Sequence, residues 1–260
     1  MQKQKGFDYE RNASNYLKKL NLVEKTFNPV GALHDRPDLE IKYNGQIRGV
    51  ELKIKAASAG SLVLKYDERK PKNQRWGFAD IKDEPEKEFL VAVAKKVGAL
   101  NEINKRWDKT PLKRDARTQE EKQALNKIPP KKRYEIDHAN FPEISKDISA
   151  LYIAQYYNEK DTYYINVGTH GFYLMGPKDP FGLNKNLSKH HMPLIADFAK
   201  IAKARFRARV QDKGNNNYQF TFELAFSISS SNKSPYNIAP VSGKDSVEID
   251  KSKVNTSCFI

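Results

Sequence analysis

Two short runs of alternating polar and apolar residues carry two acids and a lysine. Asp38 begins the run at 38–43, and Glu51 and Lys53 lie two residues apart in the run at 50–55. Because the side chains of a strand alternate between its faces, Glu51 and Lys53 are expected on one face. Carboxylates on adjacent strands are hard oxygen ligands that suit Mg²⁺. A divalent cation held there lowers the pKa of a bound water or stabilises negative charge on a phosphoryl group.

The turn between the two runs sets how these residues face one another. Asn44-Gly45 is the strongest short-range signal for a β-hairpin, with a type I′ turn. Tyr43 then pairs with Gln46, and counting back along both strands places Asp38 opposite Glu51. Such a rung brings the Cβ atoms to about 4.5–5.5 Å, where two like charges repel unless a cation lies between them. The alternative is that both acids are solvated on the open face of an ordinary hairpin.

An amphipathic helix is expected ahead of the hairpin, over residues 7–20, where apolar residues recur at helical spacing. Glu10 falls within the apolar face of this helix, three residues before Ala13 and seven before Leu17. An acid in that position either extends its carboxylate to solvent or has a function.

These motifs resemble a known family of enzymes. Arg36-Pro37-Asp38, followed after twelve residues by Glu51-Leu52-Lys53, resembles the PD-(D/E)xK nuclease superfamily, which includes many type II restriction endonucleases and resolvases. The helix that begins with Gly6-Phe7-Asp8-Tyr9-Glu10 resembles the first core helix of that superfamily, which often carries an extra acid. The resemblance covers roughly residues 6–95.

The resemblance implies roles for individual residues. Asp38 and Glu51 would bind Mg²⁺, for which Mn²⁺ can substitute, together with the backbone carbonyl of Leu52. Lys53 would orient or activate the attacking water, and Glu10 would help through a second metal or a bridging water. The implied reaction is in-line hydrolysis of a phosphodiester, which leaves a 5′-phosphate and a 3′-hydroxyl. The implied fold is of the α/β (α+β mixed) class, a restriction-endonuclease-like mixed β-sheet flanked by helices.

The charge of the chain indicates its partner. There are 46 Lys and Arg against 32 Asp and Glu, a formal net charge of +14. Such a surplus points to a polyanion, either nucleic acid or an anionic membrane surface. The membrane is disfavoured because no apolar run approaches about 20 residues. Cys258 is the only cysteine, which excludes an intramolecular disulfide. With no hydrophobic signal region after Met1, we expect a cytoplasmic protein.

Three arginines form the most regular basic array. Arg205, Arg207 and Arg209 alternate with apolar residues, so all three are expected on one strand face. A two-residue step of about 6.6–6.8 Å is close to twice the ~3.4 Å axial spacing of phosphates on one strand of duplex DNA. The array would then follow a DNA backbone, with Lys213 at the next turn reaching a groove. The alternative is an edge strand protected from aggregation by its charges.

Two weaker motifs leave further alternatives open. A second basic cluster either contacts DNA or belongs to a solvated loop; it comprises Lys127, Lys131, Lys132 and Arg133. Asp137-His138-Ala139-Asn140, with His190-His191 downstream, loosely resembles an HNH nuclease site, but zinc-stabilising cysteines and a clear ββα pattern are missing.

The chain is expected to form a single nuclease domain over 1–260, with a catalytic core at about 6–95. A charged insertion is expected at about 98–147, C-terminal strands and a hairpin at about 148–227, and a poorly ordered polar tail at 228–260. The apolar run at 89–94 predicts a buried strand. Further helices are expected at 148–157 and 194–202, strands at 163–167 and 171–175, and hairpin strands at 204–210 and 218–226.

The sequence therefore predicts a sequence-specific DNA endonuclease of the type II restriction kind. A duplex has two strands, so a homodimer acting on double-stranded DNA is the natural way to present two sites. The alternatives are a structure-selective nuclease acting on junctions or repair intermediates, and a DNA-binding protein whose acidic site is inactive. The intact set of Asp38, Glu51 and Lys53 argues against the inactive protein.

Overall fold

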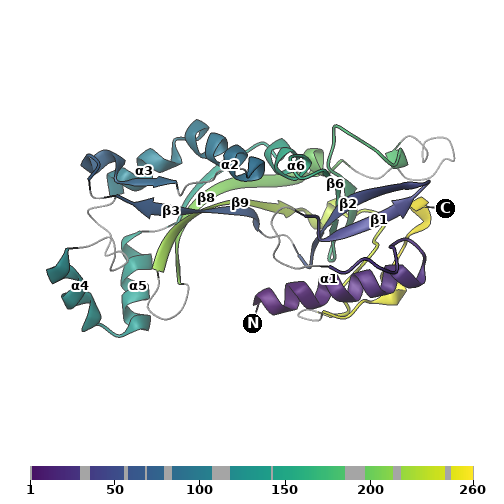
Figure 1. Ribbon diagram of the computed structural model, residues 1–260, viewed down its shortest axis with the longest axis horizontal. Helices are drawn as coiled ribbons and strands as arrows, with labels where there is room; N and C mark the ends of the chain where they lie inside the picture. The colour runs from purple at the N-terminus through teal and green to yellow at the C-terminus, as the bar shows by residue number, and fades with distance from the viewer. Residues whose placement is uncertain are drawn as a thin grey trace. The chain divides into compact units, whose positions relative to one another are not determined.

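The computed structural model combines helices with two β-sheets, so the expected α+β class is confirmed (Figure 1). It describes residues 2–29, 36–55, 58–67, 69–78, 84–106, 118–141, 143–184, 197–212, 218–243 and 247–259.

The chain divides into two compact units. The first unit contains residues 1–57, 149–204 and 226–260, and the second contains residues 58–148 and 205–225. The charged insertion expected from about residue 98 lies inside the second unit, which begins earlier and also includes part of the expected hairpin. The expected core boundary near residue 95 therefore does not coincide with a boundary between units.

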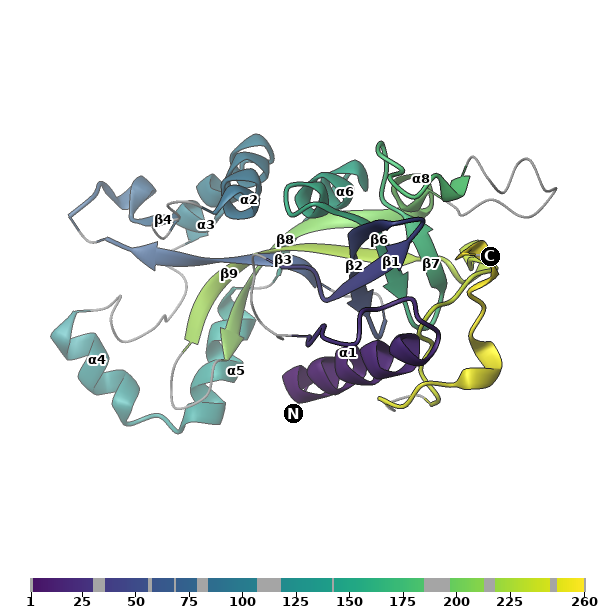
Figure 2. The ribbon, with the colours of Figure 1, turned by 45° about the vertical axis from the view of Figure 1, so that its right-hand side comes forward.

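The first unit is built on a mixed sheet with the strand order β1-β2-β6-β7. β2 pairs antiparallel with β1 and parallel with β6, and β6 pairs antiparallel with β7. The strands are β1 (Leu39–Tyr43), β2 (Gln46–Lys53), β6 (Thr162–Val167) and β7 (Gly171–Leu174). The helices are α1 (Gln2–Lys19), α6 (Leu151–Asn158) and α8 (Phe198–Ile201). α1 and α6 lie on opposite faces of this sheet (Figure 2).

The elements expected in this unit are largely confirmed. The helix at 7–20 and the helix at 148–157 correspond to α1 and α6, and the strands at 163–167 and 171–175 correspond to β6 and β7. Of the helix expected at 194–202, α8 accounts for residues 198–201, Ala202 already begins β8, and residues 194–196 lie outside the described residues.

The β1–β2 hairpin has the predicted register. Tyr43 pairs with Gln46, and Leu39 pairs with Val50. Asn44 and Gly45 both have positive φ, of 48° and 73°, which is the backbone conformation that a type I′ turn requires. β2 is an inner strand of the sheet, so its residues are held by hydrogen bonds from both sides.

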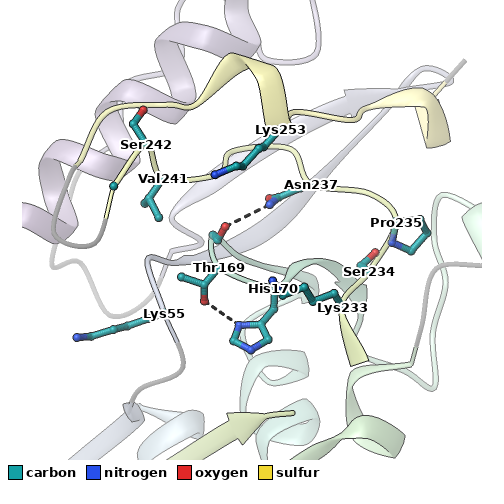
Figure 3. A pocket seen from close by; sticks show the side chains of 12 residues that line it. Lys55, Thr169, His170, Lys233, Ser234, Pro235, Asn237, Val241, Ser242 and Lys253 are labelled. Carbon is teal, nitrogen blue, oxygen red and sulfur yellow. Dashed lines mark hydrogen bonds between the residues drawn. The ribbon is translucent and has the colours of Figure 1, made fainter. Parts of the chain in front are cut away.

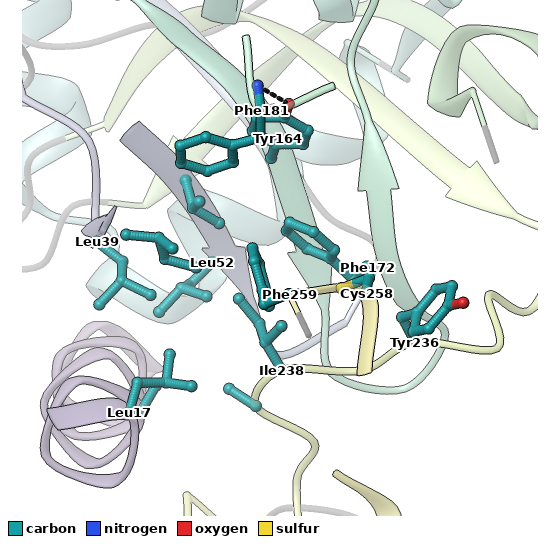
Figure 4. Close-up of a cluster of buried hydrophobic side chains, with 14 of the residues drawn as sticks. Leu17, Leu39, Leu52, Tyr164, Phe172, Phe181, Tyr236, Ile238, Cys258 and Phe259 are labelled. Carbon is teal, nitrogen blue, oxygen red and sulfur yellow. Dashed lines mark hydrogen bonds between the residues drawn. The ribbon is translucent and has the colours of Figure 1, made fainter. Parts of the chain in front are cut away.

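The hydrophobic core of the first unit lies between α1 and one face of the sheet (Figure 4). Tyr9, Ala13 and Leu17 of α1 pack with Leu39 and Leu52 of the hairpin, and all are nearly inaccessible to solvent. Burial of this apolar stripe is the main source of stability for the helix, since short helices are marginal by themselves.

The expectation of a poorly ordered tail at 228–260 is wrong for the residues described there. Ile238 and Phe259 are buried in the same core as α1 and the hairpin (Figure 4). The amide of Asn166 on β6 holds this segment: it donates to the Ala239 carbonyl at 3.3 Å and accepts from the Ile238 N–H at 3.1 Å. The misleading signal was composition, because the few apolar residues are dispersed among many Ser, Asn and Lys.

The expectation of a buried strand at 89–94 is also wrong, because these residues lie in α2 (Pro85–Lys96). Leu90, Val93 and Ala94 are buried, which is the spacing of one helix face. Pro85 at the start of the helix and lysines in its last turn are typical helix boundaries. A short apolar run cannot by itself distinguish a helix from a strand.

The second unit contains the sheet β4-β3-β9-β8-β5. β8 and β9 correspond to the expected hairpin strands, and the segment between them lies outside the described residues. The strands are β3 (Ser58–Tyr66), β4 (Trp76–Phe78), β5 (Ile144–Ile148), β8 (Ala202–Asp212) and β9 (Tyr218–Ile228). The helices that accompany them are α2, α3 (Ala99–Arg106), α4 (Gln119–Asn126) and α5 (Pro130–Asn140). Among the described residues, no helix combines the length and apolar character needed to cross a bilayer.

Replacing Ile238 tests whether the C-terminal segment belongs to the core. Ile238 is fully buried, so Ile238→Ala should lower the free energy of unfolding by about 2–5 kcal/mol, as for other large core residues. Ile47, which is 42% exposed on β2, is the matched control, and Ile47→Ala should change it by about 0.5 kcal/mol or less. Urea unfolding measures both variants. Equal midpoints for the two variants would contradict the described packing.

Candidate active site

The hairpin brings Asp38, Glu51 and Lys53 together. Asp38 directly precedes β1, and its Oδ2 accepts a hydrogen bond from the backbone N–H of Leu52 at 3.0 Å. The Lys53 ammonium donates to Glu51 Oε1 and lies 3.9 Å from Asp38 Oδ2. One lysine thus reaches both carboxyl groups, as expected if the three side chains project from one face of the hairpin.

These side chains are withdrawn from solvent. The Glu51 side chain is 5% exposed, and those of Asp38 and Lys53 are each 21% exposed. The alternative of acids freely solvated on an open hairpin face is therefore wrong. A buried like-charged pair needs compensation from its surroundings.

A close approach of two backbone segments fixes the position of Asp38. A Cβ added at Gly49 would lie 2.7 Å from Pro37 Cβ and 3.0 Å from Thr162 Oγ1, so only glycine fits there. The β2–β6 register also shifts between Gly49 and Val50, the kind of irregularity that is common beside functional sites. Pro37 packed on Gly49 therefore holds the chain just before Asp38 against β2. The sequence analysis did not single out Gly49.

The pKa values of the two hairpin acids shift in opposite directions. Burial, and then the charge of Glu51, hold the pKa of Asp38 well above its ordinary value. Burial also acts against ionisation of Glu51, but the charges of Lys53 and Lys160 outweigh it and the pKa of Glu51 is lowered. A hydrogen bond between the two carboxyl groups adds to this effect. Asp38 therefore carries the proton of the pair, and Glu51 is the ionised partner.

Lys53 remains a cation despite its burial. Desolvation acts to lower its pKa, but the charge of Glu51 beside it, with smaller contributions from Tyr157 and Asp38, raises the pKa well above its ordinary value. Lys53 thus supplies permanent positive charge to the pair of acids.

Glu10 belongs to the same electrostatic cluster. Burial raises the pKa of Glu10 to about 7, while Lys53 lowers it and Glu51 raises it further. The charge of Glu10 in turn raises the pKa of Asp38. Glu10 on α1 is thus electrostatically coupled to the hairpin residues.

α6 and the turn after it add two residues that the sequence analysis missed. Tyr157 is buried, and the Lys53 ammonium lies 6.0 Å from the centre of its ring. The Lys160 ammonium lies 5.4 Å from the Tyr156 ring and 5.6 Å from the Tyr157 ring, within range for cation–π attraction. The charge of Lys160 also lowers the pKa of Glu51. No local motif links these residues to the hairpin, because they lie far along the chain.

The oxygen atoms around Asp38 fit a hard divalent cation. The Lys53 carbonyl accepts from the Gly168 N–H at 2.8 Å, on the β6 side of β2. Carbonyls of successive strand residues point to opposite sides, so the Leu52 carbonyl faces the side of Asp38. Asp38, Glu51 and this carbonyl form the kind of oxygen set that Mg²⁺ or Mn²⁺ binds. Within the described ranges, no three His, Cys, Asp or Glu side chains form a metal centre by themselves.

The arginine array of β8 is largely engaged inside the second unit. Arg207 Nε and Arg209 Nη2 each donate to the buried carboxylate of Glu223 on β9, both at 2.8 Å. Arg205 is exposed. β8 lies between β9 and β5, so the alternative of a protected edge strand is wrong. Lys213, expected at the adjoining turn, lies outside the described residues.

The second basic cluster is partly buried. Arg133 is 3% exposed and donates to the Leu125 carbonyl at 3.2 Å, so the expectation that it contacts DNA is wrong. Its guanidinium binds a carbonyl in the last turn of α4, a common use of a basic side chain. Lys131 and Lys132 are exposed on α5, and this segment is a helix rather than a loop.

The HNH alternative finds no support in the structure. Asp137 is 1% exposed inside α5, which is a continuous helix through residue 140. A buried acid there cannot approach a substrate. His190 and His191 lie outside the described residues.

Comparisons with protein-family models, with curated proteins and with solved structures found no match to this chain. The functional argument therefore depends on the geometry and electrostatics of the site.

The raised pKa of Glu10 predicts a stability that depends on pH. Between its ordinary value of 4.5 and about 7, the folded chain binds more protons than the unfolded chain, so stability falls as pH rises through this window. Glu10→Gln removes the ionisable group that lowers stability at high pH. The variant should therefore have a raised Tm at pH 8 and a nearly unchanged Tm at pH 5. In a chain of this size each kcal/mol gained raises the Tm by about 2–4 °C.

Asp8 supplies the control for this measurement. It lies on the same helix, partly exposed, 3.6 Å from Arg11. Asp8→Asn should leave the Tm nearly unchanged, or slightly lower, at both pH values. If Glu10→Gln behaved like Asp8→Asn at pH 8, Glu10 would not belong to the acidic cluster.

Proposed function

We propose that this chain is a metal-dependent DNA endonuclease with its active site at Asp38, Glu51 and Lys53, assisted by Glu10. The observation that carries the proposal is the pair of withdrawn carboxyl groups held together across the hairpin with a lysine between them. Burying like charges side by side costs stability, and strongly shifted pKa values are typical of functional sites. A module without chemistry has no need for this arrangement.

The substrate follows from charge. The chain has a formal net charge of +14, which favours nucleic acid as a partner. Close to the acids, Lys53 and Lys160 provide two cationic groups that suit phosphate oxygens. These cations offset the repulsion between the carboxylates and a negatively charged phosphodiester, so the site can bind this kind of bond.

Each residue of the proposed active site has its own role. Asp38, Glu51 and the Leu52 carbonyl hold Mg²⁺ or Mn²⁺, which supplies Lewis-acid stabilisation of the negative charge on the phosphoryl group. Lys53 orients the attacking water and stabilises the same charge. Glu10 has a pKa of about 7, which suits a group that accepts a proton near neutral pH. From the resemblance to the PD-(D/E)xK nucleases, we expect hydrolysis to leave a 5′-phosphate and a 3′-hydroxyl.

The topology of the first unit supports a restriction-endonuclease-like core. The mixed sheet has the acids on its β1–β2 hairpin, α1 on one face and α6 on the other. We assign sequence-specific recognition of double-stranded DNA to the chain as a whole, with the second unit as a candidate recognition module. A homodimer would place one site on each DNA strand.

Incubation with plasmid DNA in Mg²⁺ tests this proposal. The wild-type chain should cut, and Asp38→Asn or Glu51→Gln should reduce the rate to background, because each removes an ionisable oxygen ligand. Both variants should still bind duplex DNA in Ca²⁺. Glu24→Gln is the matched control. The exposed carboxylate of Glu24 pairs with the Lys42 ammonium at 3.5 Å and not with a residue of the site.

The products separate the possible activities. Discrete fragments with 5′-phosphate ends support a sequence-specific enzyme, whereas a smear indicates cutting without specificity. Cutting confined to branched DNA would replace the restriction role with a junction or repair role. An Asp38→Asn variant that cuts as fast as the wild type would refute the assignment of the active site.

The β8 arginines lead to a separate prediction about DNA binding. Arg205 is exposed, so Arg205→Gln should reduce the slope of log affinity against log salt by ~0.9 if Arg205 contacts a phosphate. Arg207→Gln should leave the slope unchanged but lower stability, because the buried Glu223 loses a partner. Fluorescence anisotropy in Ca²⁺ measures both slopes. If neither slope changes, the DNA path lies elsewhere, for example along Lys131 and Lys132.

A further inference from the structure

A basic cavity lies in the first unit beside the end of β2 (Figure 3). It has a volume of about 720 Å³, within the range of small-ligand sites. Lys55, Lys233 and Lys253 line it together with His170, and they come from three separate stretches of the chain. None of the residues that line it is acidic.

The positive charge of the cavity is only partly neutralised. Lys253 pairs with Asp250 at 3.1 Å. In the described part of the chain, no carboxylate lies within ion-pair distance of Lys55 or Lys233. Three lysines that approach one cavity repel each other, so an anion bound there would relieve the repulsion.

The walls of the cavity are held rigidly. The turn that ends at Gly171 packs so closely on the C-terminal segment that a Cβ at Gly171 would lie 2.5 Å from the Tyr236 carbonyl. The Ser234 N–H donates to the His170 carbonyl at 2.9 Å, and Asn237 Nδ2 donates to the Gly168 carbonyl at 3.2 Å. The cavity is therefore preformed rather than created by a ligand.

The cavity adjoins the candidate active site along the chain. Lys55 follows Lys53 by two residues in the bend after β2, so their Cα atoms lie at most about 7 Å apart. Gly168, which lines the cavity, donates its N–H to the Lys53 carbonyl at 2.8 Å. A DNA strand with its scissile phosphate at Lys53 would thus have a neighbouring phosphate within reach of Lys55.

We propose that this cavity binds a backbone phosphate of the substrate strand next to the phosphate that is cut. The inference rests on the proposed function, and it adds a second anchoring point for the DNA. The lysines neutralise the phosphate, and Ser242 on the lining can donate a hydrogen bond to its oxygens. The Thr169 hydroxyl, also on the lining, is hydrogen-bonded to His170 Nδ1 at 2.7 Å and so connects the cavity to the His170 ring (Figure 3). Anchoring a flanking phosphate fixes the position of the scissile one.

His170 provides a reporter inside the cavity. Burial, and then the charge of Lys233, lower the pKa of His170. A phosphate in the cavity offsets the charge of Lys233 and should raise that pKa. Titration of the His170 ring signals by NMR can follow this change in the full chain.

The test combines duplex DNA binding in Ca²⁺ with two lysine variants. The Lys55→Gln/Lys233→Gln double variant removes both lysines from the one phosphate and should reduce the slope of log affinity against log salt by ~0.9, and each single variant should reduce it by part of that amount. Lys251→Gln is the matched control, because Lys251 is exposed on the same segment as Lys253 but does not line the cavity. Addition of a duplex oligonucleotide should raise the pKa of His170. The same protein in the same salt solution without DNA is the control and should show no change.

The possible outcomes are distinct. Unchanged slopes in both variants overturn the proposal, whatever the cleavage activity. If inorganic phosphate raises the pKa of His170 while the slopes stay unchanged, the cavity binds a free anion and the assignment to DNA is wrong. If the chain binds duplex through Lys55 and Lys233 but cuts no DNA in Mg²⁺, the proposed nuclease activity fails, while the cavity is still a binding site for a DNA backbone phosphate.

Discussion

Two carboxyl groups held together by a hairpin and withdrawn from solvent form the constraint on which the first unit depends. Asp38 and Glu51 share one proton, and their surroundings compensate for the remaining charge. Lys53 contributes from the same strand and Lys160 from the turn after α6, while the Leu52 N–H binds Asp38 directly. Such an arrangement lowers stability, and natural proteins accept this cost mainly where a site has a function. The hydrophobic core behind the hairpin must supply the stability that the acids remove.

The local part of this site could be predicted from the sequence because its cause is local. Asn44 and Gly45 adopt the two positive φ angles of their turn, and the turn alone sets the register that brings Asp38 to Glu51. The alternation of residues then decides which side chains share a face. Glu10 was identifiable for a similar reason, since an acid in an apolar helical stripe conflicts with the pattern around it.

The rest could not be predicted, because it arises from contacts between distant segments. Lys160 reaches Glu51 only after β6 has paired with β2, and no spacing in the sequence encodes that pairing. The run at 89–94 lies in a helix, but a short apolar run fits the two-residue repeat of a strand as well as the 3.6-residue repeat of a helix. The C-terminal segment was mistaken for a disordered tail because Ile238 and Phe259 are few among polar neighbours, although their burial decides their role. Composition averages over residues, whereas packing depends on individual ones.

The assembly of the first unit from three separated stretches, 1–57, 149–204 and 226–260, has a consequence for how the chain folds. Its core joins α1 to Phe259, so closing it brings together residues from opposite ends of the chain. Contacts of such large sequence separation make loop closure costly and folding slow. The hairpin that carries the acids is closed by local contacts, but the core that holds it in place is complete only when the stretch 226–260 has joined it. The position of the acids thus depends on non-local contacts, although the turn that pairs them is local.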